Sequence, residues 1–116
     1  MITIRMLMFS LTVFLLTTDM AQARTQLGSG GVTCGNYLKL KQIKPAERTA
    51  IESWILGLLS GLNYSRYLIR KGDLLSDKDP DQVLAWVSNH CEKNPQKDIG
   101  SATLDYWIFL LASVKE

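Results

Sequence analysis

The side chains best suited to chemistry are two cysteines and one histidine. Cys34 and Cys91 are the only cysteines in 116 residues, and His90, the only histidine, directly precedes Cys91. A reactive thiol would need His90 as its base, but adjacent residues of a helix point about 100° apart. A single histidine supports neither a catalytic triad nor a two-histidine metal site. We therefore predict no catalytic residue, no metal site and no cofactor, and a protein that is not an enzyme.

The first 23 residues indicate whether the chain is exported, and export decides whether its cysteines are oxidised. Arg5 gives a positive start, Met6 to Leu16 form an apolar run, and Ala21-Gln22-Ala23 fits a cleavage site. The run is shorter than the about 20 apolar residues that a bilayer-spanning helix needs. Residues 1–23 are thus predicted to be a cleaved signal peptide, and the mature chain is predicted to be exported, without stable membrane insertion. In an oxidising compartment we expect one disulfide, Cys34–Cys91.

Acidic residues are densest between positions 73 and 81. A calcium-binding hand would also need a loop glycine and a terminal bidentate glutamate, which this stretch lacks. Helix capping and solvation explain the aspartates better, and they are also the predicted acid-responsive group: Asp73, Asp77, Asp79 and Asp81.

The charge balance excludes strongly charged classes of protein. The chain has 13 Lys and Arg against 11 Asp and Glu, a net charge of +2, which argues against nucleic-acid partners and against polybasic membrane binding. Without residues 1–23 the chain keeps twelve basic and ten acidic residues. In strong acid, protonation of these carboxylates and of His90 raises the side-chain charge toward +13.

Hydrophobic periodicity predicts four helices after a flexible, glycine-rich arm at residues 24–33. The longest helix is predicted from Pro45 to just before Gly72, with apolar residues at helical spacing from Ile51 to Ile69. The other three are expected near residues 36–42, 80–94 and 99–114. Residues 34–116 are therefore predicted to form an all-α, single-domain bundle of about four helices clasped by one disulfide.

Two of these helices have unusual surfaces. Gly57, Ser60 and Gly61 form a stripe of small residues on the long helix, which predicts close packing within the chain, a kink, or contact with a second subunit. The last helix is apolar nearly all round, so it must be buried on several sides or face a partner. The residues predicted for a dimer or client surface, each also a candidate core residue, are Trp54, Leu58, Leu62, Trp107 and Phe109.

Two segments around the cysteines carry a family resemblance: Val32–Leu38, with a Thr-Cys pair followed by an aromatic and an aliphatic residue, and Cys91–Asp98. These segments resemble those of the HdeA/HdeB family of periplasmic acid-stress chaperones. With the predicted signal peptide and helices, the resemblance covers most of residues 32–111. The chain departs from the family in the run at residues 57–61 and in its apolar tail, where family members are more polar.

The resemblance implies a helical domain that forms a homodimer near neutral pH. In acid such a protein binds unfolding periplasmic client proteins and limits their aggregation. The rise in net charge in acid provides a mechanism. Repulsion between like charges would loosen the dimer, while the disulfide would keep the chain from unfolding completely. Client binding would then be hydrophobic.

Another class of function remains open. The Trp-Ile-Leu-Gly-Leu-Leu-Ser-Gly run at residues 54–61 resembles Rap1a-type immunity proteins, which neutralise secreted toxins in the periplasm. An immunity protein would bind a single partner tightly at neutral pH, whereas a chaperone would bind many clients in acid. An envelope assembly accessory without chaperone activity is a third possibility.

Overall fold

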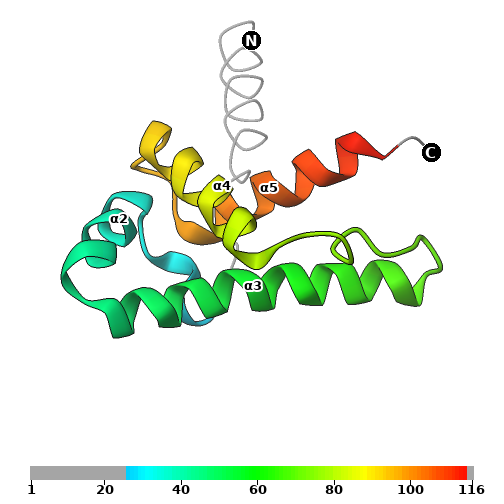
Figure 1. Ribbon diagram of the computed structural model, residues 1–116, viewed down its shortest axis with the longest axis horizontal. Helices are drawn as coiled ribbons and strands as arrows, with labels where there is room; N and C mark the ends of the chain where they lie inside the picture. Colours follow the sequence, from blue (N-terminus) through cyan, green and yellow to red (C-terminus); the bar gives the residue numbers. More distant parts are fainter. Residues whose placement is uncertain (1–25, 115–116) are drawn as a thin grey trace, which may run out of the picture.

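The computed structural model describes residues 26–114, in which a short 3₁₀ helix precedes four α-helices (Figure 1). The elements are η1 (Gly28–Gly31), α2 (Cys34–Ile43), α3 (Pro45–Leu68), α4 (Pro80–Lys93) and α5 (Ile99–Ser113). The described range contains no strand, only an isolated bridge between Thr33 and Asp98. The all-α bundle clasped by one disulfide is thus confirmed. The predicted signal peptide, residues 24–25 of the predicted arm and residues 115–116 lie outside the described range.

Helix α3 begins where the sequence predicts and ends earlier. Pro45 occupies its first turn and needs no N–H donor there. At the other end, Lys71 N–H donates to the Arg66 carbonyl across a residue in the left-handed region, Arg70, with φ of 60°. This is the hydrogen-bond pattern of a Schellman motif, with arginine in the position that glycine usually takes. The helix therefore stops at Leu68.

Side-chain caps begin the other three α-helices. Thr33 accepts a bond from the Asn36 N–H at the start of α2, and Asp98 accepts one from the Ser101 N–H at the start of α5. Asp79 caps α4, as its sequence position predicts, by accepting from the Asp81 N–H at 2.9 Å. Each cap satisfies an N–H group that has no partner within its own helix.

The core lies where α2, α4 and α5 cover α3 (Figure 1). Helix α3 contributes Ile51, Ile55 and Leu59, spaced four residues apart on one face. The core residues of the other helices are Cys34 and Tyr37 from α2, Val83, Val87 and Cys91 from α4, and Ile99, Ala102, Tyr106, Trp107 and Leu110 from α5. Among the described helices, none is both long and apolar enough to cross a membrane.

The glycine-rich segment before α2, which the sequence predicts to be a flexible arm, contacts α3 and α5 within residues 26–33. Gly30 is buried, and Leu27 accepts a 2.7 Å hydrogen bond from the indole N–H of Trp54 on α3. The carbonyl of Val32 accepts from the Ile99 N–H at the start of α5. Glycine is needed here because of the close approach of the Trp54 ring, a requirement that residue composition does not reveal.

A substitution at Gly30 should therefore destabilise the fold. A Cβ at this position would lie 2.5 Å from the Trp54 ring and 2.5 Å from the Gln26 side chain. We expect Gly30→Ala to lower the free energy of unfolding by about 1–3 kcal/mol, measured by urea denaturation with tryptophan fluorescence. Gly57→Ala is the matched control, because a Cβ there meets nothing within 4 Å. That variant should gain up to about 1 kcal/mol from helix propensity; equal effects at the two sites would contradict the packing.

The small residues of α3 face solvent. Gly57, Ser60 and Gly61 are exposed, and a Cβ at Gly61 would likewise meet nothing within 4 Å. The Ser60 hydroxyl donates to the Leu56 carbonyl of its own helix at 2.7 Å. The expectation that this stripe packs within the chain is therefore wrong. Since α3 runs from Pro45 to Leu68 as one helix, the stripe lies on its outer face without interrupting it.

Candidate functional site

The disulfide joins α2 to α4 inside the core. Cys34 and Cys91 are fully buried, with Cα atoms 4.9 Å apart. Beside them, the N–H groups of Cys34 and Gly35 donate to the carbonyls of Lys97 and Pro95 at 2.7 and 3.0 Å. These bonds fix the start of α2 against the connection between α4 and α5. The predicted Cys34–Cys91 pairing is confirmed, and neither sulfur is available as a thiolate.

An ionic cluster connects α4 to α5. The Asp105 carboxylate of α5 accepts a 2.8 Å hydrogen bond from His90 Nε2 of α4 and a 2.5 Å bond from the Lys97 ammonium group. The Asp105 side chain is 30% exposed. It is also the only charged residue of α5. One carboxylate thus links the most apolar helix to its neighbour.

The surroundings of Asp105 lower its pKa. Burial by itself raises the pKa of the carboxyl, but the hydrogen bonds and positive charges of Lys97 and His90 outweigh that effect. The group therefore stays ionised at a lower pH than free aspartic acid. The cluster could not be recognised from the sequence, because its members come from two helices and their connection. The sequence held one indication of it: Asp105 is the single charged residue in an otherwise uncharged helix.

Aromatic rings pack beside this ionic cluster on the same two helices. Trp86 of α4 stacks on the His90 ring at a centroid distance of 4.9 Å, and it contacts Tyr106 and Phe109 of α5 at 5.1 and 5.6 Å. Tyr106 is buried, whereas Phe109 is 52% exposed. The seam between α4 and α5 thus carries a titratable cluster next to an aromatic surface that reaches solvent.

Of the four aspartates predicted to respond to acid, three have separate local partners and Asp81 is exposed. Asp79 caps α4, Asp81 lies exposed in the first turn of α4, and Asp77 pairs with the adjacent Lys78 at 3.2 Å. Within residues 26–114 no group of three His, Cys, Asp or Glu residues is placed to hold a metal ion. Helix capping, the alternative interpretation, is therefore what the structure shows for Asp79.

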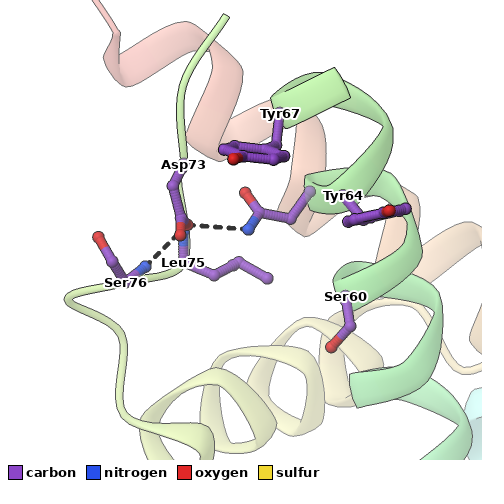
Figure 2. Close-up of a pocket in the computed structure, with 7 residues that line it drawn as sticks. Ser60, Tyr64, Tyr67, Asp73, Leu75 and Ser76 are labelled. Atoms are coloured by element: carbon purple, nitrogen blue, oxygen red, sulfur yellow. Dashed lines mark hydrogen bonds between the residues drawn. The ribbon is translucent and has the colours of Figure 1, made fainter. Parts of the chain in front are cut away.

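Asp73 organises the loop that follows α3 (Figure 2). Its Oδ1 atom accepts from the Asn63 side chain at 2.8 Å and from the N–H groups of Leu75 and Ser76 at 2.8 and 3.0 Å. The bond from Asn63, followed by the bond from Leu75, lowers the pKa of Asp73. The three bonds hold the loop against the last turns of α3.

Of the five residues predicted for a dimer or client surface, Phe109 alone is exposed. Trp107 is only 8% exposed and belongs to the core. Trp54 is half-buried and held by its bond to Leu27. Leu58 and Leu62 are half-buried on α3. The folded chain therefore brings only Phe109 of this set to an open surface.

Most of the other exposed large apolar residues gather in two places. Along α5, Ile108 and Leu111 flank Phe109 and are 61% and 38% exposed. At the end of α3, four neighbouring residues are each more than 60% exposed: Tyr64, Tyr67, Leu68 and Ile69. The sequence pattern placed Ile69 on the buried face of the long helix. That expectation fails, because α3 ends before this residue.

The α4–α5 seam is the candidate functional site of the chain. It combines a titratable cluster, an aromatic surface and the least charged helix, and its geometry suits protein binding. Comparison of the chain with protein-family models, with curated proteins and with solved structures finds no match.

Proposed function

We propose that the protein is a periplasmic acid-stress chaperone, which binds unfolding client proteins at low pH and limits their aggregation. The observation that carries this proposal is the Asp105 cluster, in which the only charge of α5 ties that helix to α4. Protonation of Asp105 removes the ionic tie and leaves α5 without side-chain charge. An apolar helix freed in this way is suited to binding exposed apolar segments of clients.

The direction of the pH effect follows from the lowered pKa of Asp105. The pKa of an aspartate in the unfolded chain is about 3.9. When the pKa is lower in the folded state, the ionised carboxylate stabilises the fold at every pH above that unfolded value. This contribution disappears as the pH falls through the folded-state pKa. Helix α5 should therefore stay docked at neutral and mildly acidic pH, and loosen only in strong acid.

Opening the seam would uncover a large apolar surface. The buried face of α5 comprises Ile99, Ala102, Tyr106, Trp107 and Leu110. The disulfide joins α2 to α4 and does not include α5, so α5 can separate while that pair stays linked. The rise in net charge toward +13 in acid would keep the client complex soluble. Near neutral pH, the apolar residues already exposed on α5 suit the homodimer that the family resemblance implies.

The direct test is a light-scattering assay of a periplasmic client with the mature chain at pH about 2 to 3 and at neutral pH. We expect suppression of aggregation in acid and none at neutral pH. Size-exclusion chromatography at each pH reports on association of the chain with itself and with the client. Absence of suppression at every acidic pH would reject the chaperone proposal.

A second candidate function is that of a Rap1a-type immunity protein. The observation that favours it is the apolar surface at the end of α3, which is exposed without any acid trigger. Affinity purification at neutral pH separates the two functions. One stable toxin-like partner in the periplasmic fraction would favour immunity, and acid-dependent recovery of many clients would favour the chaperone.

A further inference from the structure

The loop after α3 and the last turns of that helix enclose an open pocket of about 350 Å³. Figure 2 shows Asp73 and Ser76 on one side, and Ser60, Tyr64 and Tyr67 of α3 on the other. Asn63 and Leu75 complete the lining, which includes no lysine or arginine. The pocket is separate from the α4–α5 seam, and its residues have no part in the proposed acid switch.

Two tyrosines of the pocket present exposed aromatic rings. The rings of Tyr64 and Tyr67 are nearly parallel, with an interplanar angle of 23° and a centroid distance of 6.4 Å. Both side chains are more than 60% exposed. The face of an aromatic ring attracts a guanidinium or ammonium group, and arginine also stacks on it. Solvent-exposed rings in this arrangement are ready to receive a planar cation.

A carboxylate completes the charge complementarity. All three hydrogen bonds to Asp73 end on Oδ1, and no described residue donates to Oδ2. An ionised carboxylate with a free oxygen can accept from a guanidinium group. The pocket also includes Tyr67 in the last turn of α3, the end of the helix at which its dipole is negative.

An apolar pocket continues from this one along α3. It has a volume of about 280 Å³ and shares Ser60 and Leu75 with the first pocket. Its apolar lining includes Leu56, Leu59 and Val83. A polypeptide lying across both could place a basic side chain at one pocket and an aliphatic side chain in the other. This continuity favours a peptide over a small amine.

We propose that this groove binds an arginine side chain of a partner polypeptide, with a nearby aliphatic side chain of the same segment in the adjoining apolar pocket. The guanidinium group stacks against the Tyr64 and Tyr67 rings and donates to the free oxygen of Asp73. The arginine side chain binds at neutral pH, where Asp73 is ionised. This binding is therefore independent of the acid-stress proposal and can succeed or fail separately from it.

The probe is the peptide acetyl-Leu-Gly-Arg-Gly-Leu-amide, which carries an aliphatic residue on either side of the arginine. We expect it to bind the mature protein at neutral pH, with NMR shift changes centred on Tyr64, Tyr67 and Leu75. The same peptide with citrulline in place of arginine keeps the shape but loses the charge. It should bind about tenfold more weakly.

Three variants locate the binding site. Asp73→Asn keeps an acceptor for the loop N–H groups but removes the charge, and it should abolish the preference for arginine over citrulline. Tyr64→Leu and Tyr67→Leu should each weaken peptide binding by about threefold to fivefold. Asp81→Asn changes net charge by the same amount on an exposed aspartate outside the pocket, and should leave binding unchanged.

Several outcomes would overturn the proposal. Equal binding of the arginine and citrulline peptides, or equal effects of Asp73→Asn and Asp81→Asn, would show that the pocket does not select a cation. If butylguanidinium binds as tightly as the peptide, the apolar pocket makes no contribution to binding. That result would exclude a polypeptide partner. A native amide spectrum for each variant ensures that any loss of binding is not a loss of fold.

Discussion

Breaking the disulfide should lower the free energy of unfolding by about 4 kcal/mol. The bond closes a loop with a sequence separation of 57 residues, and its reduction restores conformational freedom to the unfolded chain. Since small domains are stable by only about 5–15 kcal/mol, the loss is a large part of the total. The measurement is urea denaturation of the mature protein at neutral pH, with and without a thiol-free reductant.

The chain provides its own control, because Cys34 and Cys91 are its only cysteines. A reductant therefore acts on one bond, and the double variant Cys34→Ser, Cys91→Ser should reproduce its effect. The dependence of the unfolding free energy on urea should also become steeper, because a chain without the cross-link exposes more surface when unfolded. An unchanged unfolding midpoint after complete reduction would show that packing alone holds α2 against α4.

Under the proposed chaperone function, removing the charge of Asp105 should move acid activation to higher pH. In Asp105→Asn the bonds from His90 and Lys97 lose their ionic character, so we expect a loss of about 1–2 kcal/mol at neutral pH. In the parent chain, protonation of Asp105 removes the stabilisation that its carboxylate provides. The variant has no such carboxylate, so its free energy of unfolding should change less between neutral pH and strong acid. Near-UV circular dichroism reports the loosening of packing around Trp86 and Trp107, and light scattering reports client protection.

The control variant for Asp105→Asn is Asp81→Asn, which removes one carboxylate from an exposed site at the start of α4. Both variants raise the net charge equally, so general self-repulsion changes alike in the two. A shift of the activation midpoint in Asp105→Asn only would assign the switch to the α4–α5 seam. Equal midpoints in both variants and the parent chain would assign acid activation to overall charge instead.

Much of the local structure could be predicted because it depends on neighbouring residues. The cap by Asp79, the start of α3 at Pro45 and the end of α4 at Asn94 each depend on backbone bonding within a few residues. The end of α3 was harder to place. Arg70 takes the left-handed conformation usually reserved for glycine, so the helix stops before Gly72, and Ile69 is exposed instead of buried.

The candidate site was much less predictable. Three of the four aspartates chosen from the sequence have local partners and the fourth, Asp81, is exposed. The carboxylate that links two helices is instead that of Asp105, which the sequence distinguishes only as the one charge of its helix. Phe109 alone among the predicted surface residues is exposed. Trp54 could not be assigned correctly, because its partner Leu27 is 27 positions away in a segment predicted to be flexible.

The all-α class, the main helices and the single possible disulfide could all be predicted from the amino-acid sequence. Helical periodicity and capping act over a few residues, and two cysteines allow only one pairing. Which helix faces meet depends on the folded chain: the glycine-rich segment packs against Trp54, the small residues of α3 remain in solvent, and His90 lies against Asp105. These outcomes depend on how the helices dock, because one docking arrangement determines at once which side chains become neighbours and which remain exposed.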